Sequence, residues 1–140
     1  MKILIGVDES SFSQAAVESV AQRSWAVGTQ VKIVSAVDDY FGAAEDSNHY
    51  QIASRAVDHV IETLRKSQNQ FELSGEIVDG APPEVILAEA EKWGAELIVV
   101  GSHGRRGLGR FLLGSVSQAV ALHANCSVQI VRPAARSEAS

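Results

Sequence analysis

The sequence is poor in the features that mark secreted and membrane proteins. Its 140 residues include one cysteine, Cys126, which excludes an internal disulfide and fits a reducing compartment. Nowhere does an apolar run approach the ~18 residues of a membrane span. The apolar run 3–5 is followed soon by Asp8 and Glu9, so it is too short for the core of a signal peptide. We therefore expect a cytoplasmic protein.

Positive charge is also scarce. Lysine and arginine number 12 against 17 acidic residues, which gives a net charge of −5 and argues against a general nucleic-acid binder with a basic face. Hydrophobic residues make up 46% and charged residues 21%, the balance of an ordinary globular protein that can bury a core. We predict a single domain over residues 1–133, followed by a short disordered tail, 134–140.

Short apolar runs alternate with helical patterns along the chain. Strands are predicted at 2–8, 31–37, 71–79, 97–100 and 125–131, and helices at 11–27, 50–68, 84–93 and 115–124. Such alternation predicts a parallel sheet with helices on both faces and right-handed crossovers. The strand at 71–79 alternates apolar and polar residues, which favours an edge of the sheet.

Helical spacing also predicts which side of each helix is buried. In the first helix the inner stripe is Ala16, Val20 and Val27, and Gly28 is the expected stop. The second helix has an inner stripe of five apolar residues: Ile52, Ala56, Val60, Ile61 and Leu64.

A glycine-rich stretch, 101–117, joins the fourth predicted strand to the last helix. Its turn exposes backbone N–H groups, and the helix start adds free donors and the positive end of a dipole. Serines 115 and 117 stand at that helix start, while arginines 105, 106 and 110 lie within the loop. We interpret the stretch as a phosphate cradle at the carboxyl ends of the strands, where α/β sheets bind ligands.

Several polar residues have a structural alternative to a ligand role. Asp8 could cap the first helix, and Ser115 with Gln118 matches a capping box. His103 is expected to pack or to face solvent, not to act as an acid or base. Asp38 and Asp39 could hold a magnesium-bound water, but an exposed acidic turn is the simpler interpretation. The histidines show no metal-ligand spacing, so we predict no catalytic and no metal-binding residue.

The spacing of Gly101, Gly104 and Gly114-Ser115 resembles that of nucleotide-binding members of the universal stress protein family. Residues 5–8 with Ser10 resemble the family's opening strand and its aspartate, and 128–133 its closing strand.

This resemblance implies an α/β, doubly wound, five-stranded sheet of order 3-2-1-4-5, with ATP across the ends of strands one and four. Asp8 would bind the ribose, Ala36 the adenine edge, and Val100 and Gly101 would line the ribose side. The phosphates would be bound by Gly104, Arg105, Gly114, Ser115, Val116 and Ser117. A homodimer through 127–132 is expected both from the family and from the exposed apolar edge of the last strand.

Other functions fit less of the sequence. A receiver-type signalling domain would need a lysine after the fifth strand, where Arg132 and Pro133 stand. A kinase or ATP hydrolase would need a motif such as Gly-x-x-x-x-Gly-Lys, which does not occur. A nucleotide-independent member of the family would not need all three motif glycines. We expect an ATP-binding sensor or adaptor in stress response, with Mg²⁺ accompanying ATP, an unknown protein partner and at most very slow hydrolysis or autophosphorylation.

Overall fold

The computed structural model describes residues 1–8, 10–38, 48–68, 70–103 and 113–133. Strands and helices alternate along these residues in the predicted order. The elements are β1 (Lys2–Gly6), α1 (Ser11–Ala21), β2 (Gln30–Val37), α2 (Asn48–Ser67), β3 (Glu72–Asp79), α3 (Pro82–Trp93), β4 (Leu97–Gly101), α4 (Ser115–His123) and β5 (Ser127–Val131). The predicted tail, 134–140, lies outside the described residues.

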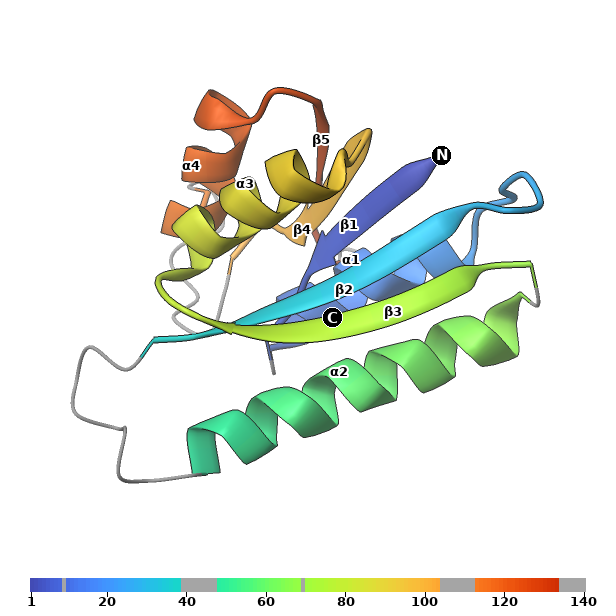
Figure 1. Ribbon diagram of the computed structural model, residues 1–140, viewed down its shortest axis with the longest axis horizontal. Coiled ribbons are helices and arrows are strands. Elements are labelled where there is room, and N and C mark those ends of the chain that lie inside the picture. Colours follow the sequence, from blue (N-terminus) through green and yellow to red (C-terminus); the bar gives the residue numbers. More distant parts are fainter. Residues whose placement is uncertain (9, 39–47, 69, 104–112, 134–140) are drawn as a thin grey trace, which may run out of the picture.

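The strands form one sheet of order β3-β2-β1-β4-β5, in which every described pair is parallel. Helices α1 and α2 cover one face of the sheet, and α3 and α4 cover the other (Figure 1). The predicted fold class and strand order are confirmed.

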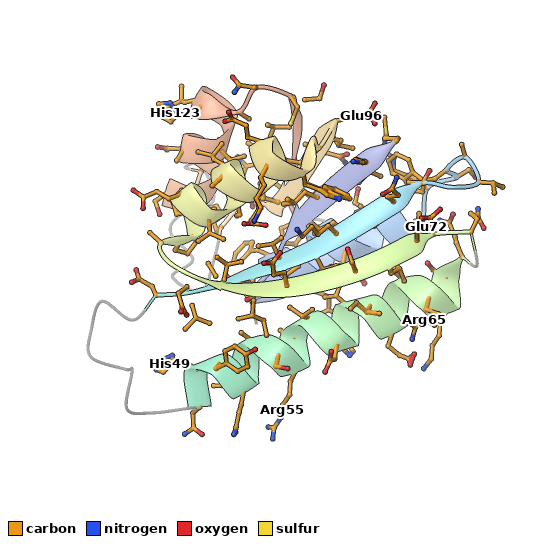
Figure 2. The ribbon with its side chains drawn as sticks, viewed as in Figure 1. His49, Arg55, Arg65, Glu72, Glu96 and His123 are labelled. Atoms are coloured by element: carbon orange, nitrogen blue, oxygen red, sulfur yellow. The ribbon has the colours of Figure 1, made fainter. Side chains whose placement is uncertain are left out.

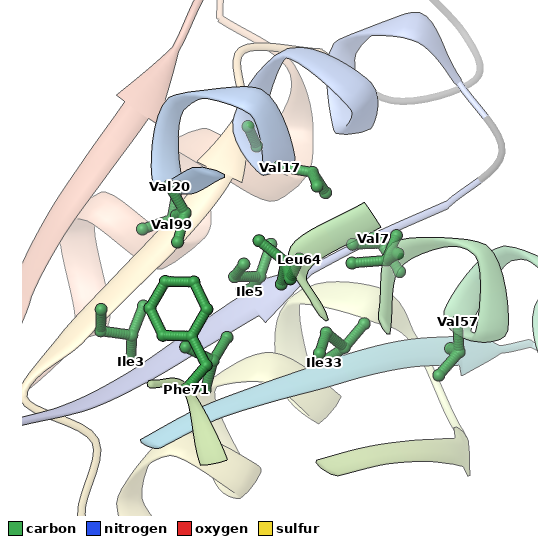
Figure 3. Close-up of a cluster of buried hydrophobic side chains, with 13 residues drawn as sticks. Ile3, Ile5, Val7, Val17, Val20, Ile33, Val57, Leu64, Phe71 and Val99 are labelled. Carbon is green, nitrogen blue, oxygen red and sulfur yellow. The ribbon is translucent and has the colours of Figure 1, made fainter. Parts of the chain in front are cut away.

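Central strand β1 contributes to a hydrophobic core on each face, because successive side chains of a strand point to opposite sides. Ile3 and Ile5 pack with Leu64 of α2 in one cluster (Figure 3). Leu4 packs with Ile86 of α3 in the other cluster. A strand buried on both faces is apolar at nearly every position, which is why this segment could be recognised from the sequence.

Strand β3 lies at an edge of the sheet, as its alternating pattern predicted. Leu73 and Ile77 pack toward α2, while Glu72 and Ser74 are exposed. Helix α2 lies so close to β3 that a Cβ on Gly75 would stand 2.5 Å from a Val57 methyl carbon.

Helix α1 ends six residues earlier than predicted, at Ala21 rather than Val27. The indole nitrogen of Trp25 donates a hydrogen bond of 2.9 Å to the carbonyl oxygen of Val20, so the chain folds back over the last turn. Val27 is 88% exposed, and Gly28 adopts a positive φ of 88° in the turn before β2. An indole donor at a helix end has no fixed spacing in sequence, so periodicity alone could not find this boundary.

The buried stripe of α2 is also rotated from the predicted one. It consists of Ala53, Val57, Val60 and Leu64, and the predicted Ile52 is 44% exposed. These buried positions recur at the spacings of an ideal helical face. Arg55 and Arg65 extend from the opposite side of the helix, away from the sheet (Figure 2).

Candidate functional site

The carboxyl ends of β1, β2 and β4 meet at one edge of the sheet. The pairing of β1 with β2 aligns Gly6 with Val34, so Asp8 and Ala36 each follow that pair by two residues. Strand β4 lies on the other side of β1, and residues 100–101 end at the same level. The sheet therefore brings together segments that are far apart in sequence, as the strand-order prediction required.

Asp8 organises the turn between β1 and α1. Its Oδ1 accepts hydrogen bonds from the Ser10 backbone N–H at 2.8 Å and from the Ser13 hydroxyl at 3.0 Å. Its own backbone N–H donates to Ser13 Oγ at 2.7 Å. Ser10 is the N-cap of α1, and its hydroxyl oxygen accepts from the Ser13 N–H at 3.3 Å. Asp8 thus supports the helix start, and no described bond occupies its Oδ2.

The two ends of the glycine-rich segment are joined by hydrogen bonds. The Gly114 N–H donates to the carbonyl oxygen of Ser102 at 2.7 Å, which places the start of α4 against the end of β4. The buried hydroxyl of Ser117 donates to the same oxygen at 2.9 Å and lies 3.0 Å from the Gly114 carbonyl oxygen. We call this set of bonds among Ser102, Gly114 and Ser117 the clasp. It fixes where the first turn of α4 points.

Among the residues that the structure describes, no side chain caps the N-terminus of α4. Gly114 is the N-cap residue, and the first intrahelical bond runs from the Gln118 N–H to the Gly114 carbonyl oxygen at 3.0 Å. The predicted capping box is therefore wrong: Ser115 lies inside the helix and is exposed, and the Gln118 side chain donates to Leu113 instead. No bond from a described residue occupies the N–H groups of the first turn, and these groups can bind an acceptor from outside the helix.

Gly101 and His103 have packing roles that the sequence did not reveal. A Cβ on Gly101 would stand 2.5 Å from the Phe12 carbonyl oxygen, so glycine is needed here for α1 to pack on β4. The ring of His103 is buried, lies 5.0 Å from that of Phe12, and places Nδ1 3.2 Å from Ser102 Oγ. His103 packs, as expected. Among the described residues its buried Nε2 has no partner.

The structure describes some of the remaining predicted site residues and leaves others outside the described ranges. The side chain of Val100 is buried in the core beneath α3, so only its backbone lies near the edge. Ala36 is half-buried at the end of β2. Gly104 and Arg105 lie outside the described residues, as do Arg106, Arg110 and Asp39.

The described residues contain no group of three or more histidine, cysteine, aspartate or glutamate side chains that could hold a metal ion. Asp38 is exposed at the end of β2. Within the described part of the chain, no helix has the length and apolar character needed to cross a membrane.

Cys126 lies away from this edge, before β5, in a groove of about 200 Å³ that it shares with Glu91 and His123. It is half-buried, as a small hydrophobic residue would be. Burial raises the pKa of its thiol, which therefore stays protonated at neutral pH.

The chain is a doubly wound α/β protein. An aspartate follows its first strand, and the start of its last helix is held against its fourth strand. Residues 1–132 match the model of the universal stress protein family. The chain belongs to this family.

Individual relatives are similar over most of the chain. Universal stress protein A homolog 2 of Coxiella burnetii is 34% identical over 141 residues, which cover 93% of this chain and 92% of that protein. A universal stress protein of Methanocaldococcus jannaschii is 31% identical over 138 residues, with 94% and 81% covered.

Solved structures share the fold at lower identity. A family protein of Arabidopsis thaliana with AMP bound has a TM-score of 0.76 and 18% identity, with 98% of this chain and 94% of that chain covered. The universal stress protein of Archaeoglobus fulgidus in complex with dAMP has a TM-score of 0.73 and 24% identity, with 94% and 97% covered.

Proposed function

We propose that this protein binds ATP at the carboxyl ends of β1, β2 and β4. The observation that carries the proposal is the uncapped first turn of α4, which the clasp holds beside the end of β4. Backbone N–H groups at a helix start bind phosphate through hydrogen bonds and the helix dipole. The structural neighbours solved with AMP and dAMP support an adenine nucleotide as the ligand.

Each predicted residue that the structure describes then has a role that its position allows. Asp8 would accept a ribose hydroxyl at Oδ2, while Oδ1 holds the turn. The backbone at Ala36 would contact the adenine edge, and that of Val100 and Gly101 the ribose. The exposed hydroxyl of Ser115 and the N–H groups at 115–117 would bind phosphate oxygens, with Gly104, Arg105 and Gly114 alongside. The hydroxyl of Ser117 would support the clasp, not the ligand.

The proposed activity is sensing, in the cytoplasm, and not efficient catalysis. The nucleotide would change what the surface around residues 104–117 presents to a protein partner. Fast phosphoryl transfer needs an aligned nucleophile and positive charge focused on the γ-phosphate. At the described edge Asp8 is committed to the turn and to the ribose, and the donors at α4 are uncharged.

A homodimer through β5 completes the proposal. Strand β5 is an edge of the sheet and carries no charged side chain, so two copies can pair without repulsion.

The decisive experiment identifies the ligand directly. The purified protein is denatured, and any released nucleotide is identified by chromatography; the nucleotide-free protein is then titrated calorimetrically with ATP, AMP and GTP. We expect an adenine nucleotide to be released or to bind, and GTP to bind more weakly. Absence of binding by both adenine nucleotides at millimolar concentration would contradict the proposal.

A further inference from the structure

The two edge strands of the sheet differ in charge. Strand β5 has no charged side chain, whereas β3 carries Glu72, Glu76 and Asp79. In the part of the chain that the structure describes, β3 pairs with β2 alone (Figure 1). An open edge strand can accept another strand through its backbone groups.

The direction of the backbone bonds shows which residues of β3 face outward. The N–H groups of Glu72 and Gly80 donate toward β2, to Thr29 and Val37. Along a strand these directions alternate from residue to residue, so Leu73, Gly75, Ile77 and Asp79 direct their N–H and C=O groups away from the sheet.

The two sides of this edge have different chemistry. On the α2 side, a groove of about 390 Å³ combines the apolar side chains of Tyr50, Val57, Ile61 and Ile77 with the polar residues Ser54, Asp58 and Glu76. Val57 and Ile61 approach β3 closely because Gly75 has no side chain.

On the opposite side, β3 presents acidic and polar side chains. Glu72 and Ser74 are exposed, and Glu72 stands at the start of the strand (Figure 2). Glu76 is part of the same row and forms an ion pair of 2.9 Å with Lys32. Helix α3 packs over β2, and its Glu89 shares Lys32 with Glu76.

We propose that β3 is a docking edge for an extended segment of a partner protein in which apolar and basic residues alternate. The apolar side chains enter the groove beside α2, and the basic side chains lie beside Glu72 and Ser74. Opposite charges on neighbouring strands attract, and the two-residue period places each kind of side chain on its own side.

A second copy of this chain is a poor occupant for the same reason. Pairing of β3 with its own copy would bring Glu72, Glu76 and Asp79 of both copies to one seam, and like charges across neighbouring strands repel. The difference in charge between the two edge strands favours self-association through β5 and binding of a basic partner by β3. This inference does not depend on nucleotide binding.

The test uses a fluorescent, capped peptide of alternating valine and lysine with the length of β3, 8 residues. A second peptide has the same composition with its valines and lysines in two blocks. We expect the alternating peptide to bind more tightly by fluorescence polarisation. Amide NMR shifts should be confined to β3 and to the side of α2 that lines the groove. Equal binding of both peptides, or shifts elsewhere, would overturn the proposal.

Charge reversal provides the matched variants. Glu72→Lys should weaken binding of the alternating peptide about three- to tenfold, the range expected when an attractive cross-strand pair becomes repulsive. Glu18→Lys makes the same change of charge on the exposed side of α1 and should leave the affinity for the alternating peptide within twofold of wild type. Ser74→Lys tests the same face if Glu72→Lys fails to fold. Equal affinity of the Glu72 or Ser74 variant and the Glu18 variant would overturn the proposal, as would β3–β3 pairing in the wild type.

Discussion

Two serines at the start of α4 illustrate how one residue type serves two purposes. The hydroxyl of Ser117 is buried in the clasp, whereas Ser115 is exposed two residues earlier. Ser117→Ala should lower the free energy of unfolding by about 0.5–1.5 kcal/mol, because it removes one internal hydrogen bond. The carbonyl groups it leaves keep other donors, from Gly114 N–H and Gln118 N–H. Chemical denaturation of both proteins gives the difference.

Ser115→Ala is the control for that change. It should alter stability by less than about 0.5 kcal/mol, since an exposed residue that caps nothing contributes little. It should nevertheless weaken nucleotide binding. Equal destabilisation by both substitutions would show that Ser115 has a structural role after all.

Gly114 tests the phosphate interpretation more directly. Its φ of −69° is an ordinary value, so a larger side chain does not strain the backbone. Valine at position 114 is therefore compatible with this backbone, and its side chain would occupy the space proposed for the phosphate oxygens. Loss of charge-assisted hydrogen bonds at ~1.5–3 kcal/mol each would lower ATP affinity by orders of magnitude in calorimetry. Gly114→Ala should lower the ATP affinity less than Gly114→Val does. Unchanged affinity in a folded Gly114→Val protein would refute the phosphate cradle.

At the residue scale the sequence predicted positions better than roles. Asp8 and Gly101 were identified because they follow buried strands, and the sheet does bring them to one edge. The close packing of Phe12 against Gly101 could not be predicted, because this contact joins a helix and a strand through space. The clasp was missed for the same reason: it connects residues 102 and 117.

At the scale of elements, β5 offers a sharp test of dimerisation. Val131 accepts a bond from the Ser102 N–H, so alternation directs the N–H of Ile130 away from β4, toward the open edge. Ile130→Pro should remove a donor from that edge, yield monomers in light scattering and largely keep the fold. Gln129→Pro, its control, removes a donor that faces β4 and should destabilise the whole domain. A wild-type protein that is monomeric at micromolar concentration would contradict the dimer itself.

Three elements are joined by Lys32 of β2, which lies 2.9 Å from Glu76 of β3 and 3.2 Å from Glu89 of α3. The hydrogen bond from Lys32 lowers the pKa of the Glu76 carboxyl, against the opposing effect of its partial burial. Burial lowers the pKa of Lys32, but hydrogen bonds to both glutamates outweigh it and raise the pKa overall.

This arrangement predicts a pH-dependent contribution to stability. A carboxyl whose pKa is lowered by folding stabilises the protein above its unfolded pKa of about 4.3, and this contribution disappears as pH falls through the folded value. Glu76→Gln should cost at most about 1 kcal/mol at pH 7, because the pair is partly exposed. In urea denaturation the difference from wild type should vanish at low pH. Glu72→Gln, on the same strand, should change the free energy of unfolding less than Glu76→Gln does at pH 7. If the difference between Glu76→Gln and wild type grew as the pH falls, this account would be contradicted.

Element types and order were predictable because each strand is a short apolar run and each helix has a period near 3.6 residues. The ends of the elements and the rotation of each helix about its axis were harder to predict. The end of α1 depends on an indole that reaches back to Val20, and the face of α2 depends on the close approach of Val57 to Gly75. Both are tertiary contacts that local periodicity does not encode.

For the molecule as a whole, we predict that ATP is held and turned over well below the ~1–100 s⁻¹ of kinases. Binding that does not favour the transition state gives affinity without rate. Single-turnover measurement of phosphate release with Mg²⁺ and labelled ATP checks this, with Gly114→Val as the background control. Release at several per second that Gly114→Val abolishes would mean that a catalytic residue has been overlooked.

The central position of β1 has a consequence for how the chain is made. Its second neighbour, β4, begins only at Leu97, so a nascent chain emerging from the ribosome holds Ile3, Leu4 and Ile5 with one edge unpaired until the residues from Leu97 onward have been made. Such non-local pairing slows folding and leaves an apolar strand open to wrong partners. The edge formed by the ends of β1 and β4 and the start of α4 cannot form before that moment, so the proposed nucleotide site is complete only after synthesis has passed Ser117.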